Sequence, residues 1–279
     1  MPQKFATLLS GGLMRGSFQG GACYAIEELE ENGGVARGDT VAGSVGVCNG
    51  IFRATRSVRR SSLIWRDCVH GRQLIYWKWG RPRMHTRHLL ECFRRYLPAE
   101  QLGRHGKFIA VLTDLETGMP VYLEIGPASP IWRIVLASIA IPPLVEPVRI
   151  EERFFADGGL SDPLPIRFLI EQGYTEITVI LNRPLSYRDD PGFNRAVSSF
   201  ILRSFPEARR AFVESAARCN QDLELLQNPP SGIKVRVIAP PENPISRLCR
   251  AREELLRFWR CGYAEAYRAF GKIPPPPPF

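Results

Sequence analysis

The chain has 279 residues, of which 44% are hydrophobic and 23% charged, an ordinary composition for a globular protein with a sizeable core. No apolar run approaches the roughly 18 residues of a membrane span, because the longest candidate, 131–145, is interrupted by Arg133, Ser138 and two prolines. The seven cysteines are scattered without a CxxC pair, which argues against a disulfide framework or a zinc site. We therefore expect a soluble, cytoplasmic protein without a metal or cofactor.

Short apolar runs that end at turn residues alternate along the chain with segments of helical periodicity. The predicted strands are 5–9, 39–42, 108–112, 121–123, 148–154, 177–181 and 233–238. The predicted helices are 20–31, 45–56, 164–171, 193–227 and 246–270. Strands that alternate with helices predict an α/β fold, with a mostly parallel central sheet covered by helices on both faces.

No linker or break in composition divides these elements, so residues 1–273 are expected to form a single domain. The tail, 274–279, is rich in proline and is expected to be disordered. The segment 52–101 fits the alternation least well. We interpret it as a helical insertion or cap.

The net charge of +9 is unevenly distributed along the chain. Between residues 52 and 95 there are twelve Lys or Arg and only two acids, and four aromatic residues lie among them: Trp65, Tyr76, Trp77 and Trp79. Such a segment is most often a solvated basic face whose aromatic residues belong to the core. It is also typical of a surface for an anionic partner, either a phospholipid interface or a nucleic acid. Nucleic acid is not expected, because no module that binds it is recognisable.

One serine fits the pattern of a nucleophile elbow, a sharp strand-to-helix turn with small residues two before and two after the serine. Ser44 lies between the predicted strand 39–42 and the predicted helix 45–56, with Ala42 and Gly46 at the two crowded positions. A helix N-terminus at this point favours a developing negative charge. Taken alone the pattern is weak, and a plain glycine–serine turn is the more common interpretation.

A glycine-rich turn follows the first predicted strand directly, with the sequence Ser10-Gly11-Gly12-Leu13-Met14-Arg15-Gly16. Backbone N–H groups in such a turn can hold the oxyanion of an ester-cleavage intermediate, and Arg15 adds a cation. A nucleotide phosphate loop is the competing functional interpretation, but neither the dinucleotide nor the Walker spacing is present. A tight strand-to-helix turn without any ligand is about equally compatible with these residues.

A serine nucleophile needs a base. The four histidines all lie in the basic segment 52–101 or at its edge: His70, His85, His88 and His105. None therefore follows the late strands, where a hydrolase of Ser–Asp–His order would have its histidine. Asp157 follows the predicted strand 148–154 and precedes two glycines. In isolation it would be interpreted as an Asx turn. Together with Ser44 and the glycine-rich turn, a catalytic carboxylate becomes the better interpretation.

Three motifs in this order resemble those of the patatin-like phospholipases, and more closely their bacterial branch. The family's GGGxRG loop, G-x-S-x-G elbow and late D-G-G/A correspond to residues 11–16, the elbow at Ser44 and Asp157-Gly158-Gly159. Its T-D-x-x-T/S-G and A-S-x-A-x-P segments, and the bacterial sequence after DGG, correspond to residues 113–118, 137–142 and 160–165. The resemblance covers at least residues 5–182.

The resemblance implies a three-layer α/β/α fold and a Ser44–Asp157 dyad that cleaves acyl esters of phospholipids or related lipids through an acyl-enzyme. It implies that the oxyanion hole is formed by Gly11, Gly12, Leu13 and Arg15. An ordinary aspartate, with a pKa near 4, is a poor base, so a dry site that raises this pKa is expected. The basic segment would dock the protein on an anionic membrane, as a peripheral contact at its inner face.

Two residues depart from the family's pattern. Leu13 stands at the position of the third glycine of the loop, and Ala42 at the first glycine of the elbow. The Cβ of Leu13 restricts its φ angle, and a lost oxyanion donor lowers the rate on the order of 100- to 1000-fold. The alternative hypothesis is therefore a catalytically weak or inactive patatin-like protein that binds anionic membranes or a protein partner.

Overall fold

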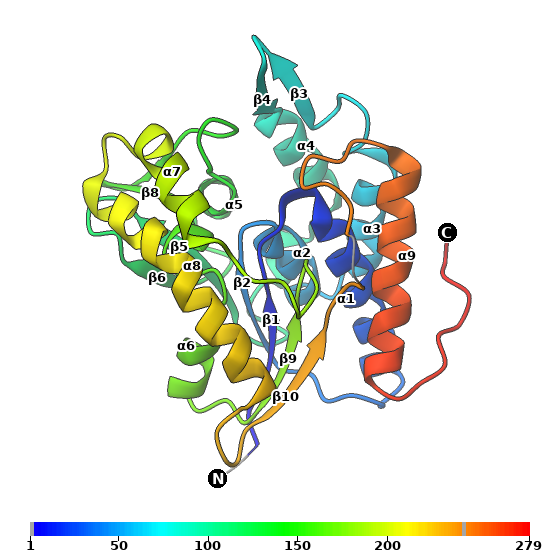
Figure 1. Ribbon diagram of the computed structural model, residues 1–279. Coiled ribbons are helices and arrows are strands. Elements are labelled where there is room, and N and C mark those ends of the chain that lie inside the picture. Colours follow the sequence, from blue (N-terminus) through cyan, green and yellow to red (C-terminus); the bar gives the residue numbers. More distant parts are fainter. Residues whose placement is uncertain (1–2, 242–243) are drawn as a thin grey trace.

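The computed structural model describes residues 3–241 and 244–279, and a mixed sheet forms its centre (Figure 1). The central sheet of these residues has eight strands in the order β10-β9-β1-β2-β5-β8-β7, with β6 paired to β5. Five strands are parallel: β1 (Phe5–Leu9), β2 (Asp39–Gly43), β5 (Phe108–Asp114), β9 (Glu176–Ile180) and β10 (Lys234–Ile238). Three others pair antiparallel with their neighbours: β6 (Pro120–Glu124), β7 (Val148–Ile150) and β8 (Arg153–Asp157).

Helices cover both faces of this sheet (Figure 1). One layer contains α1 (Gly16–Glu31), α2 (Val45–Ala54) and α9 (Arg252–Ala269), and the other contains α6 (Ile166–Glu171) and α8 (Pro206–Gln227). Successive residues of β5 alternate between the layers, because side chains of a strand point to opposite faces. Phe108 and Ala110 pack in the first layer, whereas Ile109 and Val111 pack in the second. The structure thus confirms the predicted three-layer α/β/α fold with a mostly parallel sheet.

Several elements differ from the prediction in their bounds. The predicted strand 148–154 is a hairpin of β7 and β8, which turns at Glu151, where φ is 53°. The predicted helix 193–227 is divided into α7 (Pro191–Ile201) and α8, because Pro206 lacks an N–H and disfavours helix at the residue before it. A helix that was not predicted, α5, spans Ile131–Ser138.

The basic segment, 52–101, is only partly helical. It contains α3 (Val58–Asp67) and α4 (Thr86–Tyr96), but between them lies a two-stranded hairpin of β3 (Ile75–Lys78) and β4 (Arg81–Met84). Figure 1 shows this hairpin at the top of the molecule, beyond the ends of β1, β9 and β10. The helical insertion expected from the sequence therefore also carries a projecting β-hairpin.

Helices α1 and α9 approach each other unusually closely, through a glycine on each. A Cβ on Gly21 would lie 1.9 Å from the carbonyl oxygen of Trp259, and a Cβ on Gly262 would lie 1.8 Å from that of Phe18. Neither position can hold a larger residue unless the helices separate. Residues 274–279 have no regular secondary structure, and the Phe279 ring lies 4.5 Å from the Trp259 ring. No helix in the described part of the chain is long and apolar enough to cross a membrane.

Candidate active site

Ser44 lies on the sharp turn between β2 and α2, where it precedes the first residue of the helix. Its φ of 56° and ψ of −134° are unfavourable for a residue with a Cβ, and such strain is found mostly at functional sites. Gly46 permits the turn, since a Cβ there would lie 2.4 Å from the carbonyl oxygen of Leu9. Ala42 is fully buried in the core, which accommodates its methyl group. Crowding between β1 and α2 explains the small residues around the serine.

Asp157 lies at the end of β8 and is held by three hydrogen bonds. Its backbone N–H donates to the carbonyl of Ala140 (3.1 Å), and its own carbonyl accepts from the Thr113 hydroxyl (2.8 Å). Its Oδ1 accepts from the backbone N–H of Gly159 (2.8 Å). Thr113 and Ala140 belong to the two additional motifs of the sequence, so those motifs have a structural role in positioning this carboxyl group.

The second oxygen of Asp157 is buried and unpaired. The residue is only 1% exposed, and Oδ2 has no hydrogen-bond partner among the residues that the structure describes. Burial raises the pKa of Asp157 to about 7, although the neighbouring Ser44 hydroxyl and the Gly159 N–H partly offset this rise. The two predicted residues therefore lie side by side, with Oδ2 of the carboxyl group free to accept a proton.

The glycine-rich loop lies directly against Ser44. A Cβ on Gly11 would be 3.0 Å from the Ser44 Cβ. Within 3–241 and 244–279, the N–H groups of Gly11, Gly12 and Leu13 donate no hydrogen bond to another residue. The loop therefore has unused donors next to the serine, as an oxyanion hole requires.

Leu13 and Arg15 contribute to this loop in different ways. Leu13 has a φ of 52°, so the backbone adopts at this position a conformation that is ordinary for glycine and costs another residue about 1–3 kcal/mol. The Arg15 side chain donates from Nε to the carbonyl of Ile245 (2.7 Å), and the Met14 N–H donates to that of Arg247 (3.1 Å). These bonds attach the loop to the segment before α9.

Three buried amide side chains that the sequence analysis missed support the loop. Asn182 donates from Nδ2 to the carbonyl of Ser10 (2.9 Å), and Gln19 donates from Nε2 to the same oxygen (3.2 Å). Asn49 donates to the carbonyl of Gly16 (2.9 Å) and accepts from Nε1 of Trp65 (2.9 Å). An isolated amide has no sequence signature, so these residues could not be found by pattern.

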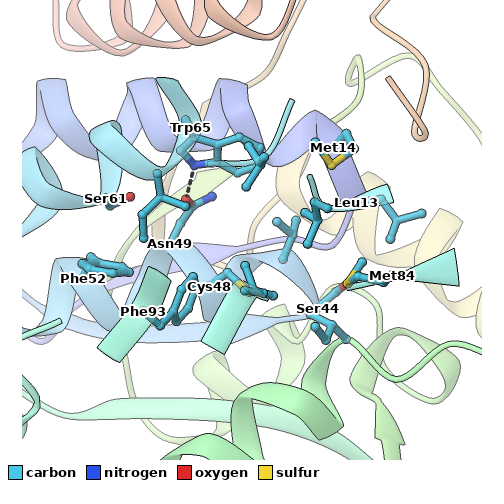
Figure 2. A pocket seen from close by; sticks show the side chains of 16 residues that line it. Leu13, Met14, Ser44, Cys48, Asn49, Phe52, Ser61, Trp65, Met84 and Phe93 are labelled. Carbon is cyan, nitrogen blue, oxygen red and sulfur yellow. Dashed lines mark hydrogen bonds between the residues drawn. The ribbon is translucent and has the colours of Figure 1, made fainter. Parts of the chain in front are cut away.

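An apolar pocket opens beside Ser44. Its enclosed volume is small, about 50 Å³, and apart from Ser44, Asn49 and Ser61 its lining is apolar. In Figure 2, Ser44, Leu13 and Met84 lie at one end, and Phe52 and Phe93 lie at the other. One face of α2 forms a wall, from Ser44 to Phe52, which spans about 12 Å at a rise of 1.5 Å per residue. The pocket thus extends from the serine into the first core layer.

The three-layer fold, with a pocket at the ends of its parallel strands, places the chain among α/β proteins whose ligand sites lie at that edge of the sheet. The model of the patatin-like phospholipase family matches residues 8–170, which is more than half of the chain. The chain therefore belongs to the patatin-like phospholipase family, as its motifs indicated. Residues 205–274 match a domain of unknown function, DUF6363.

Similar proteins include an uncharacterized NTE family protein of Mycobacterium bovis and two of Mycobacterium tuberculosis. Each is 44% identical over 59 residues, which is 21% of this chain and only 16% of the relative. The crystal structure of VipD from Legionella pneumophila aligns with a TM-score of 0.48 and 14% identity, over 97% of this chain and 67% of that one.

Proposed function

We propose that the protein is a lipid acyl hydrolase of the phospholipase A or esterase type, with Ser44 as the nucleophile and Asp157 as its base. Family membership supports an acyl lipid as the class of substrate. The observation that carries the proposal is the unpaired Oδ2 of Asp157 beside Ser44, which lies at one end of an apolar pocket. A hydroxyl, a carboxyl group and an apolar pocket beside them are what the transfer of an acyl group needs.

In the first half of the proposed reaction, Oγ of Ser44 attacks the ester carbonyl while its proton passes to Oδ2 of Asp157. The N–H groups of Gly12 and Leu13 hold the tetrahedral oxyanion, with that of Gly11 as a further donor. The intermediate then collapses, the bond to the alcohol breaks, and Asp157 returns the proton to the departing oxygen. The acyl group remains on Ser44 as an ester.

In the second half, Asp157 removes a proton from water, and the oxygen of that water attacks the acyl-enzyme. Collapse of the second intermediate releases the fatty acid and returns the proton to Ser44. A base is most effective when its pKa is near the working pH, and burial raises the pKa of Asp157 to about 7. The dry surroundings of this carboxyl group are thus suited to a base at neutral pH.

Labelling with a fluorophosphonate, which reacts with activated serines, tests the proposal. We expect the wild-type protein to be labelled, and Ser44→Ala and Asp157→Asn to lose the label. Ser61→Ala is the matched control, because Ser61 lines the same pocket and has no role in the proposed reaction. A folded wild-type protein that takes up no more probe than Ser44→Ala would exclude catalysis by this serine.

The alternative function is binding of a membrane or partner without ester turnover. One observation favours it: Leu13 lines the pocket at Ser44 and keeps a strained φ in the loop that has to hold the oxyanion. Leu13→Gly separates the two functions. If the strain at Leu13 displaces its N–H from the oxyanion, glycine raises the rate of labelling at least about tenfold, because a well-placed oxyanion donor is worth that much or more. A measurable rate that is unchanged means that the loop already functions with leucine, whereas no labelling of either protein supports binding without turnover.

A further inference from the structure

The hairpin of β3 and β4 places two tryptophans in solvent. Trp79, in the turn between the strands, is 89% exposed, and Trp77 is 52% exposed. The base of the hairpin is anchored: Arg83 donates to the carbonyl of Pro143 (2.6 Å), and the Met84 N–H donates to that of Leu144 (3.3 Å). The apolar tip is therefore held outward by a supported stem (Figure 1).

The turn at the tip is a poor place for tryptophan on grounds of folding alone. Trp79 and Gly80 have φ angles of 49° and 70°. A two-residue hairpin turn with both φ angles positive favours Asn-Gly or Gly-Gly, and a bulky residue in the left-handed region is an outlier. Residues in such conformations cluster at binding and switch sites. An exposed, strained tryptophan at this position points to a role in binding.

The strand register gives the hairpin two different faces. Trp77 pairs with Pro82, and Ile75 pairs with Met84, so these four residues share one face. Met84 lines the pocket beside Ser44. The apolar face of the hairpin therefore continues from the Ser44 end of the pocket toward the tip.

The opposite face of the hairpin carries cations. It presents the pair Lys78–Arg81 at the tip and Tyr76–Arg83 below it. Between residues 70 and 90 the chain has no Asp or Glu, and its Lys and Arg residues are Arg72, Lys78, Arg81, Arg83 and Arg87. Lys78 lies over the Trp79 ring at 4.6 Å, and Arg81 lies over the ring of Phe200, which is itself 65% exposed, at 5.5 Å. Exposed aromatic rings and cations thus alternate around the tip.

We propose that this hairpin inserts Trp79 and Trp77 into the interface of an anionic bilayer, with Lys78 and Arg81 at the level of the lipid phosphates. Tryptophan with flanking cations suits this layer, because the ring is amphipathic and the long cationic side chains extend to the headgroups. Each cation near an anionic surface strengthens binding about fivefold. A protein partner fits less well, since two indoles offer at most about 500 Å², below the roughly 800 Å² per side of a standard interface.

Docking in this way positions the pocket as well as the protein. Because Met84 belongs to both the hairpin and the pocket, insertion of the tip brings the Ser44 end of the pocket toward the bilayer surface. A lipid acyl chain could then enter the pocket without crossing bulk water. Only this last step rests on the proposed hydrolase function, whereas binding to the membrane does not.

Co-sedimentation of the whole protein with vesicles tests the proposal, with Ser44→Ala in every sample so that no lipid is consumed. Vesicles of phosphatidylcholine alone are compared with vesicles that also contain phosphatidylserine. We expect binding to the anionic vesicles, and weaker binding as salt screens the charges. Binding that is equal on both vesicles and indifferent to salt would overturn the electrostatic part of the proposal.

Trp79→Asn is the decisive variant, because Asn-Gly is a favoured pair in this turn and the hairpin keeps its fold. We expect at least about tenfold weaker binding to anionic vesicles, from the lost burial of an indole, with an unchanged or higher melting temperature. Ile273→Asn is the control, since Ile273 is 92% exposed and follows α9, far along the chain from the hairpin. Parental binding by Trp79→Asn, or an equal loss in Ile273→Asn, would refute insertion of the hairpin.

Two further measurements separate insertion into a membrane from self-association and from catalysis. Sedimentation velocity without lipid would reveal self-association of the protein. If the parental protein self-associates but does not bind vesicles, and Trp79→Asn no longer self-associates, the tip contacts a second copy and the membrane role is overturned. With Ser44 intact, Trp79→Asn is expected to hydrolyse a short water-soluble ester at the parental rate and vesicle lipid more slowly. Absence of all hydrolysis would refute the proposed function alone, because the vesicle result does not depend on it.

Discussion

Replacing Asp157 by asparagine is expected to stabilise the protein while it abolishes catalysis. The carboxyl group is 1% exposed, and burial raises its pKa from 3.8 to about 7. At 1.36 kcal/mol for each pH unit, that difference corresponds to about 4 kcal/mol that the folded protein loses when the group is ionised. Asparagine has the same shape and no charge, and its Oδ1 keeps the bond from Gly159.

The gain in stability depends on pH, with a definite sign. Below about pH 4, Asp157 carries a proton in both the folded and the unfolded chain, so wild type and Asp157→Asn differ least. As the pH rises from there to about 7, the unfolded chain ionises first, and the wild-type protein loses stability relative to the variant. Above about pH 7 the loss is complete. We expect Asp157→Asn to be about 2–4 kcal/mol more stable near pH 8, after allowance for relaxation around the charge.

Urea unfolding of both proteins near pH 4 and near pH 8 measures this difference, and hydrolysis of a soluble ester gives the functional counterpart. The kcat/KM of the wild-type protein should rise with pH and level off above about 7, while the variant loses at least about 100-fold. Asp114→Asn is the control. Asp114 is also 1% exposed, but its carboxylate accepts from the N–H groups of Glu116 and Thr117 and pairs with Arg153.

Asp114→Asn should therefore lower the free energy of unfolding, by about 1–3 kcal/mol. An Asp157→Asn protein that is no more stable than wild type near pH 8, or whose gain is the same near pH 4, would refute the burial argument. Asp157 would then not be a carboxyl group kept ready for protonation.

Two other predictions follow from the elbow and from the pocket. Gly46→Ala should destabilise the protein by about 1–3 kcal/mol, because its Cβ would lie 2.4 Å from the Leu9 carbonyl oxygen. Gly43→Ala is the control and should cost less, since a Cβ there meets nothing closer than 3.9 Å. Equal melting temperatures of the two variants would contradict this. For esters of increasing acyl length, kcat/KM should rise about fourfold per methylene until the chain reaches Phe52 and Phe93, and Phe93→Ala should move this limit to longer chains. A rise that continues past this limit in the wild-type protein would place the acyl chain elsewhere.

The sequence was sufficient to identify residues of the candidate site where a local backbone constraint selects the residue type. The turn at Ser44 leaves room only for small neighbours, and the positive φ of Leu13 lies where the family has glycine, so both positions could be identified by pattern. The sequence was not sufficient to identify residues whose position is set by contact with a distant segment. Asn182 supports Ser10 across 172 residues of sequence, and nothing in its local sequence indicates this. The roles proposed for Ser44 and Asp157 stay predictions.

The hairpin shows a different limit of sequence analysis. The basic and aromatic composition of 52–101 was apparent, but four-residue strands are too short for a period of two to be distinguished from helical spacing. The cations were therefore assigned to a helical insertion. Only the register of β3 and β4 reveals that Trp77 and Lys78 belong to opposite faces.

The glycine contact between α1 and α9 has a consequence for the order in which the protein is built. Helix α1 follows the glycine-rich loop directly, whereas its partner α9 begins only at Arg252. The bonds from Met14 and Arg15 likewise require the late residues Ile245 and Arg247, which precede α9. Although domains fold from the N-terminus during synthesis, the loop beside Ser44 acquires these supports only after residues 252–269 have left the ribosome. The surroundings of Ser44 are therefore completed only after this helix has been synthesised.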